Sequence, residues 1–148
     1  MKLIISEKEI AARRIAQILS DNNAKEEKVY SVPVHSFSYR GTDFKSIGLK
    51  GHILQVEFPP EYTNWIKVPP QELIDASLEK KPIEKRIIQA LNKISADAES
   101  IIIATDFDRE GELIGYDAYD LLRNKYGEIP VKRARFSAIT QKDINNAF

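Results

Sequence analysis

The sequence predicts an α/β fold in which a central, mostly parallel sheet is flanked by helices and interrupted by an inserted β-hairpin. A strand, a turn and a helix follow one another over residues 2–19. A second unit of this kind begins at residues 100–105, which are apolar on both faces, as in a parallel strand covered by helices on both sides. Between the two units, residues 28–58 have the pattern of antiparallel strands.

Length and composition define the class of protein. The 148 residues correspond to one domain, spanning residues 1–148. Lys and Arg number 22, as do Asp and Glu, so the net charge creates no long-range attraction to phosphate or to an anionic membrane. The absence of Cys excludes disulfides, thiolate zinc sites and cysteine nucleophiles. No apolar run reaches the ~20 residues of a membrane span, and the N-terminal run is too short for a signal peptide. We therefore expect a cytoplasmic protein with no membrane partner.

The N-terminal elements follow from hydrophobic periodicity. Residues 2–6 predict a short buried strand, and the helix after it has an apolar stripe of Ala11, Ile15, Ile18 and Leu19. Residues 21–27 are polar and predict a loop. Strands are expected at 29–34, 35–39, 44–47 and 53–58, with a turn at Arg40-Gly41-Thr42. A hairpin inserted in an otherwise alternating α/β chain accounts for them.

The C-terminal elements continue the alternation. Paired prolines at 59–60 and 69–70 bracket a stretch that contains Tyr62, Trp65 and Ile66. We expect an ordered loop packed by its aromatics rather than a regular element. Pro82 is expected in the first turn of a helix whose stripe is Ile83, Ile87, Ala90, Leu91 and Ile94. The remaining elements are a strand at 100–105, a helix at 110–125, a strand at 131–137, and a helix capped by Thr140 with Asp143. Because this last helix runs to the end of the chain, we expect an N-terminal fragment of a longer protein.

An acidic cluster is the most informative motif. It reads A-T-D-F-D-R-E-G-E-L-I-G over residues 104–115 and places Asp106, Asp108 and Glu110 at the carboxyl end of a buried strand, where open α/β sheets bind ligands. Carboxylate oxygens suit Mg²⁺, with substrate phosphate completing the shell. Acidic residues are also favoured in the first turn of any helix, but Asp106 and Asp108 precede the helix. We therefore favour metal binding.

Glu7 follows the first strand as Asp106 follows the later one. If the two strands are neighbours in a parallel sheet, the two carboxylates converge at one edge. A lone glutamate here is more often solvated, but beside an acidic cluster it becomes a candidate general acid or base. Lys8 is placed to meet a phosphate oxygen, although a solvated lysine is the commoner outcome.

Four sequence motifs, in a fixed order along the chain, indicate the protein family. They comprise L-I-I-S-E-K followed by A-R-R-I-A, then G-H-I-L with P-x-x-Y and Trp65 downstream, then A-T-D-F-D-R-E-G-E-L-I-G, and finally R-F-S-A-I-T before A-F. Together these resemble the Toprim domain, with its Rossmann-like fold. Within this family they resemble the N-terminal Toprim portion of type IA DNA topoisomerases, of the archaeal and topoisomerase III-like branch. The resemblance covers nearly the whole chain.

The resemblance implies a function and a set of site residues. Glu7 would be the general acid and base at the scissile phosphodiester, and Lys8 would contact that phosphate. The three carboxylates of the acidic cluster would hold Mg²⁺, with Arg109 near the substrate and His52 as a candidate substrate-binding residue. The activity implied is Mg²⁺-dependent breakage and rejoining of single DNA strands. Implied partners are single-stranded DNA and the remaining topoisomerase domains, in the cytoplasm at the nucleoid.

The chain departs from the family pattern in three places. Glu9 stands where the related branch usually has proline, which leaves the contact geometry around Lys8 open, and Ala138 stands where the family often has glutamate. The tyrosine nucleophile of the family lies in a separate downstream domain, and none of the six tyrosines here has its R-T-D-S-like context. The chain is therefore expected to contain half of an active site.

Three other functions compete. A freestanding Toprim nuclease or primase-like phosphoryl transferase would use a metal-activated oxygen in place of tyrosine, but G-H-I-L and R-F-S-A-I-T favour the topoisomerase. A phosphoacceptor receiver needs its acidic pair after the first strand, where this chain has Ser6-Glu7-Lys8. A DNA-docking module would use the basic run at 132–135, although strand alternation places only half of those side chains on one face and a solvated edge is the simpler reading.

Overall fold

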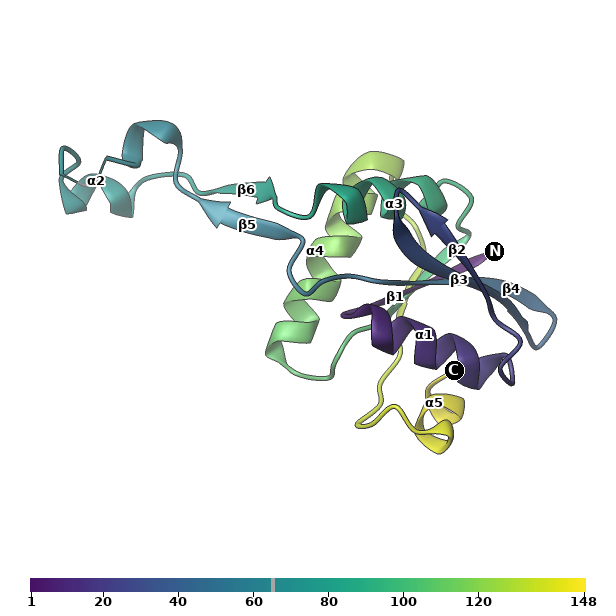
Figure 1. Ribbon diagram of the computed structural model, residues 1–148. Coiled ribbons are helices and arrows are strands. Elements are labelled where there is room, and N and C mark those ends of the chain that lie inside the picture. The colour runs from purple at the N-terminus through teal and green to yellow at the C-terminus, as the bar shows by residue number, and fades with distance from the viewer. Residues whose placement is uncertain (65) are drawn as a thin grey trace.

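A computed structural model describes residues 1–64 and 66–148 and contains a six-stranded sheet with the strand order β2-β3-β4-β1-β7-β8 (Figure 1). Its strands are β1 (Lys2–Ser6), β2 (Lys25–Val29), β3 (Val32–Tyr39), β4 (Thr42–Gly48), β7 (Ser100–Ala104) and β8 (Val131–Arg133). The pairs β4–β1, β1–β7 and β7–β8 are parallel, whereas β2–β3 and β3–β4 are antiparallel. The predicted α/β fold with a mostly parallel sheet is confirmed.

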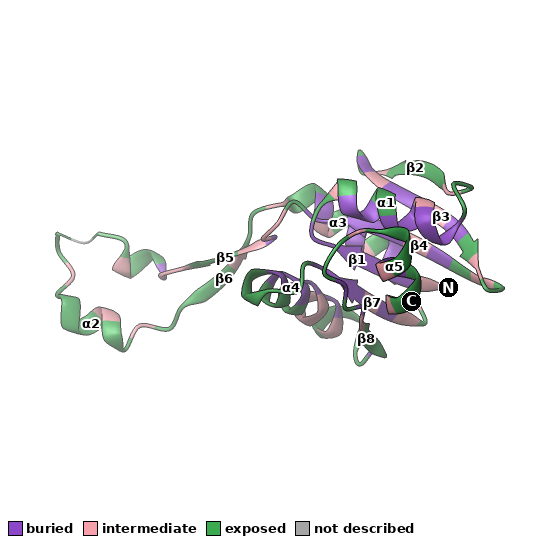
Figure 2. Ribbon diagram, turned by 90° about the horizontal axis from the view of Figure 1, so that it is seen from below, coloured by how far each residue is buried: buried purple, intermediate pink, exposed green. Residues whose placement is uncertain are grey.

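Helices cover both faces of the sheet. They are α1 (Glu9–Leu19), α3 (Lys85–Ser95), α4 (Arg109–Tyr126) and α5 (Gln141–Ala147). Leu3 and Ile5 of β1 belong to the core that packs with α3 and α4, while Ile4 between them packs with α1 and α5. Successive side chains of a strand point to opposite faces, so the central strand is buried on both (Figure 2).

Two tight turns build the antiparallel part of the sheet. Arg40 and Gly41 turn between β3 and β4 with φ of 49° and 73°, at the predicted position. A second turn, at Tyr30 and Ser31 with φ of 50° and 67°, interrupts the strand predicted at 29–34. Two-residue turns of this left-handed kind match the twist of a hairpin, although neither Tyr30 nor Ser31 is a typical residue for one.

The edge strand β2 corrects another prediction. The loop predicted at 21–27 ends at Ala24, because Lys25–Val29 pairs with β3. The first four residues of β2 are exposed and charged, since the strand lies at the edge of the sheet. Such a strand lacks the apolar alternation by which strands are recognised, and charges at an edge prevent pairing with other chains.

A narrow arm projects from the body between β4 and α3 (Figure 1). It consists of the hairpin β5 (Leu54–Glu57) and β6 (Glu79–Pro82), a short 3₁₀ helix at Pro60–Tyr62 and α2 (Pro70–Ile74). The expected absence of a regular element is wrong at Pro60–Tyr62, which is helical. Of the aromatics expected to pack the loop, Tyr62 is half-buried and Trp65 lies outside the described residues.

The remaining boundaries differ slightly from the predictions. The helix expected from Pro82 begins at Lys85, because Pro82 pairs with Leu54 in the arm. Strand β8 ends at Arg133, short of residue 137. The predicted cap of α5 is confirmed, since Thr140 Oγ1 accepts a hydrogen bond from the Asp143 amide at 3.1 Å. Within the described ranges, no helix is both long and apolar enough to cross a membrane.

Candidate active site

Three parallel strands bring the candidate residues to one edge of the sheet. Ser6, the last residue of β1, lies opposite Gly48 of β4 on one side and Ala104 of β7 on the other. Glu7 and the acidic loop that follows Ala104 therefore leave the sheet side by side. The prediction that β1 and β7 are neighbours in the sheet is confirmed.

Glu7 and Lys8 form an ion pair at this edge. The Glu7 residue is 7% exposed, and its Oε1 lies 2.9 Å from Lys8 Nζ, whose side chain is 68% exposed. The hydrogen bond from Lys8 to Glu7 and the Glu7 charge raise the pKa of Lys8 above 10.5, and the charges of Asp106 and Glu110 raise it further. The edge of the sheet thus contains a buried carboxylate beside a cation that stays protonated.

Asp108 caps helix α4. Its Oδ1 accepts a hydrogen bond from the Gly111 amide at 2.7 Å, so helix capping explains an acidic residue at this position, contrary to our expectation. The exposed Asp106 is different, because its carboxylate makes no hydrogen bond or ion pair with residues 1–64 or 66–148. Asp106 is the acidic residue that the helix does not account for.

His52 lies beside the acidic cluster. Its Nε2 is 3.7 Å from Glu110 Oε1, although the two residues are far apart in sequence. Both side chains are accessible, at 39% and 67% exposed. Arg109 is exposed on the first turn of α4 and pairs with none of these acids in the part of the chain that is described. The structure therefore brings His52 to the cluster and leaves Arg109 facing solvent.

Close packing at Gly111 fixes the shape of the acidic loop. A Cβ atom at Gly111 would lie 2.1 Å from the Asp106 carbonyl oxygen, so no larger residue fits without moving the loop. Thr105 Oγ1 donates a hydrogen bond of 2.7 Å to the Gly111 carbonyl from the other side. The end of β7 and the start of α4 are thus held together.

Arg133 is a site residue that the sequence analysis missed. The basic run at 132–135 was interpreted as a solvated edge, but the Arg133 side chain is only 17% exposed. It donates to the carbonyl oxygens of Asp106 at 2.9 Å, Ala134 at 2.7 Å and Ile103 at 3.2 Å, and pairs with Glu112 at 2.8 Å. The only signal in the sequence is a run of cations at the end of a neighbouring strand, and the run does not identify which of its residues turns inward.

The exposed Phe107 lies between the two acidic residues of the loop. Its residue is 59% exposed, and the guanidinium groups of Arg133 and Arg135 lie 5.9 and 5.5 Å from the ring centroid. Arg133 is the last residue of β8 and Arg135 lies two residues beyond it, and both reach the same ring. An accessible aromatic ring with two neighbouring cations is suited to contact a nucleic-acid base.

The acidic cluster is an open set of metal ligands. Among the described residues, the one group of three whose ligand atoms lie within 4.8 Å of one another is elsewhere, at Glu9, Glu26 and His35. Mg²⁺ keeps several waters and needs only one or two carboxylates plus a substrate phosphate. The unpaired Asp106 and the exposed Glu110 fit this requirement, because both offer accessible oxygen ligands.

Comparisons with known proteins agree with this geometry. DNA topoisomerase 1 of Archaeoglobus fulgidus is 42% identical over 146 residues, which cover 99% of this chain and 22% of that protein. DNA topoisomerase 1 of Thermoplasma acidophilum is 40% identical, with 99% and 19% covered. DNA topoisomerase 3-alpha of Drosophila melanogaster is 36% identical, with 98% and 12% covered. The chain thus spans about a fifth or less of the relatives that it matches.

The family itself follows from a match over most of the chain. The Toprim domain matches residues 2–139, which include β1, the acidic loop and the strand after α4. The resemblance to the Toprim portion of type IA DNA topoisomerases is therefore confirmed. This chain belongs to the Toprim domain family.

Proposed function

We propose that this chain is the Toprim part of a type IA DNA topoisomerase, which breaks and rejoins single DNA strands. The observation that supports it best is the placement of the Glu7–Lys8 pair at the same sheet edge as the acidic loop, so that a buried carboxylate, a cation and accessible metal ligands share one site. The tyrosine nucleophile and the remaining domains lie outside residues 1–148. The protein acts in the cytoplasm on nucleoid DNA.

The side chains divide the chemistry among them. Lys8 contacts the scissile phosphate, and Glu7 protonates the departing 3′ oxygen and removes that proton on resealing. The ion pair between them holds the Glu7 carboxylate in one orientation. Arg109 and His52 contact the DNA strand next to the phosphate.

Toprim domains bind divalent metal ions. We propose Mg²⁺ here, held by Asp106, Asp108 and Glu110, because hard oxygen ligands are what the acidic loop offers. The bound ion would neutralise charge on the phosphate. Asp108 would retain its cap to α4 and use its second oxygen for the metal.

A pocket next to Lys8 is the proposed path of the DNA strand. It has a volume of about 750 Å³ and its lining includes Lys8, Lys50, Lys85 and Arg86. The lining also contains Glu9 and Glu84, which pairs with Lys50 at 3.8 Å. The remaining excess of positive charge provides a local phosphate attraction that a chain of zero net charge otherwise lacks. A strand in this pocket would reach the Glu7 carboxylate at one end.

The test compares activity of the isolated chain with that of a longer protein that contains it. The 148-residue chain with Mg²⁺ should neither cleave nor relax supercoiled plasmid. In the longer protein, Glu7→Gln should slow cleavage by ~10² to 10⁴-fold, because glutamine keeps the shape without the proton. The matched control is Glu72→Gln, the same change at an exposed position of the arm. Relaxation by the isolated chain, or equal rates for the two variants, would refute the proposal.

The freestanding nuclease is the second candidate, since the acidic loop alone could position an attacking water. It predicts Mg²⁺-dependent nicking by the isolated chain. That nicking should disappear in Asp106→Asn, which removes the unpaired carboxylate.

A further inference from the structure

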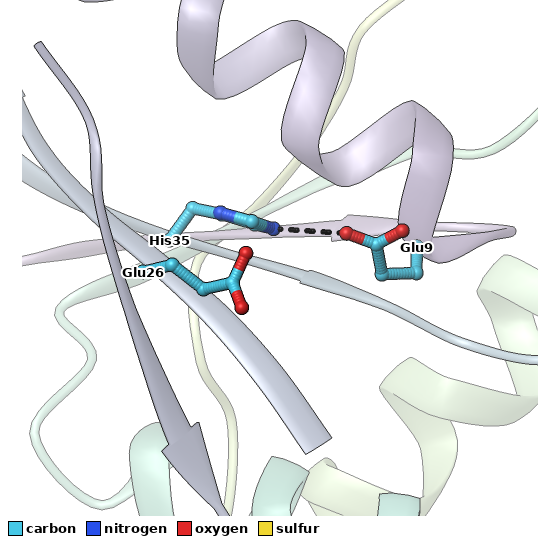
Figure 3. Close-up of side chains that lie close together, drawn as sticks. All are labelled: Glu9, Glu26 and His35. Carbon is cyan, nitrogen blue, oxygen red and sulfur yellow. Dashed lines mark ion pairs between the residues drawn. The ribbon is translucent and has the colours of Figure 1, made fainter.

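A second cluster of ligand atoms lies on the α1 side of the sheet, apart from the acidic loop. It consists of Glu9 at the start of α1, Glu26 on β2 and His35 on β3, and one ligand atom of each lies within 4.8 Å of those of the other two (Figure 3). Glu26 and His35 are directly opposite in the β2–β3 pairing, so their side chains share a face. The three residues come from three separate elements that the fold holds together.

The Nε2 atom of His35 is buried without a hydrogen bond to any described residue. The residue is 3% exposed, and its Nε2 makes no hydrogen bond in the described part of the chain. The nearest carboxylate oxygen is Glu9 Oε1, at 3.4 Å, longer than the 2.7–3.2 Å of an N–H···O hydrogen bond. This contact is the ion pair drawn in Figure 3, and it leaves the buried nitrogen without a hydrogen bond among residues 1–64 and 66–148. A buried nitrogen in this state costs free energy, so its position beside two carboxylates calls for a ligand.

The spacing of these atoms suits a metal ion. Two ligands of a tetrahedral ion with bonds of ~2.1 Å are ~3.4 Å apart. The distance between Glu9 Oε1 and His35 Nε2 has this value. Glu26 is exposed on the edge strand, so its side chain is free to complete the shell and the ion can enter from solvent.

We propose that Glu9, Glu26 and His35 bind a divalent transition-metal ion, of which Zn²⁺ is the representative, with water as the fourth ligand. One imidazole and two carboxylates favour such an ion over Mg²⁺, which prefers oxygen ligands alone. The site is thus chemically distinct from the acidic loop. Because Glu9 directly follows Glu7 and Lys8, the ion would fasten the start of α1 to the β2–β3 hairpin.

The experiment is a calorimetric titration of the EDTA-treated chain with Zn²⁺. The background is Asp106→Asn with Asp108→Asn, which weakens competing binding at the acidic loop. One ion should bind per chain, and His35→Gln should weaken the affinity by about tenfold or more. Glu27→Gln is the control, because Glu27 follows Glu26 on β2 but pairs with Lys45 and lies outside the cluster. It should leave the affinity unchanged.

A second variant covers the case in which His35→Gln fails to fold, as judged by circular dichroism. Glu26→Gln changes an exposed residue and should also weaken Zn²⁺ binding. Absence of Zn²⁺ binding to the folded chain would overturn the proposal, as would equal affinities of the Glu26 variant and its parent. Neither result affects the proposed topoisomerase function, which is read from Mg²⁺-dependent cleavage.

Discussion

Replacement of Arg133 by methionine tests whether this side chain holds the acidic loop in place. Arg133 donates to three carbonyl groups and pairs with Glu112. Arg135→Met is the matched control, because it removes the same charge two residues beyond β8 and the same kind of contact with Phe107. The two variants differ in the hydrogen bonds of Arg133, in its ion pair with Glu112 and in its greater burial.

The expected loss of stability follows from those bonds. The Ile103 carbonyl keeps a second donor, the Ala134 amide at 2.9 Å, so the carbonyl groups of Asp106 and Ala134 are the two that lose a charged donor. Each such bond contributes about 1.5 kcal/mol at a partly hydrated place. The ion pair with the exposed Glu112 adds less than about 1 kcal/mol. Arg133→Met should therefore lower the free energy of unfolding by about 3 to 4 kcal/mol.

Urea unfolding followed by circular dichroism measures this difference. For a chain of this length the loss corresponds to roughly 11 °C in melting temperature. Arg135→Met should stay within about 0.5 kcal/mol of the parent. Arg133→Lys should lose most of what methionine loses, because an ammonium lacks the planar fork. Equal stability of the Arg133→Met and Arg135→Met variants would refute the reasoning.

Three further predictions concern other contacts. Gly111→Ala should cost about 1 to 3 kcal/mol in urea unfolding, because its Cβ would overlap the Asp106 carbonyl; an unchanged midpoint would contradict this. Asp108→Asn should keep the stability of the metal-free chain, since asparagine also caps helices, whereas Asp108→Ala should lose about 1 kcal/mol. The Asp117 carboxylate accepts a hydrogen bond from Lys80 and raises the pKa of Lys80 above 10.5. The stability that Lys80→Met removes should therefore be constant up to pH 10.5 and shrink at higher pH, as unfolding at several pH values will show.

The elements that the sequence predicted correctly are those with a buried face. Strand β1 and helices α3 and α4 bury apolar side chains at the period of a strand or a helix, and that period is visible in the sequence. Strands β2 and β6 were missed, because their exposed residues have no apolar period. The predicted start of α3 was too early, because Pro82 pairs with Leu54 in the arm and is not available to the helix.

The site was predictable only in part. The parallel pairing that brings Glu7 next to the acidic loop follows from two strand–turn–helix units, and it could be expected from the sequence. The contacts of Arg133 and the distance from His52 to Glu110 depend on how separate segments pack, which no local pattern records. The group formed by Glu9, Glu26 and His35 was missed because its members come from three elements.

The arm has its two ends joined at the body. The Ile83 amide donates to the Ile53 carbonyl at 3.0 Å, so the chain leaves and re-enters the body at adjacent points. The entropy cost of closing a loop grows only slowly with its length, so the stability of the body depends little on the length of the arm. A short turn or a reporter domain could therefore replace the arm between Ile53 and Ile83. The replacement would remove the hydrogen bond from Lys80 to Asp117.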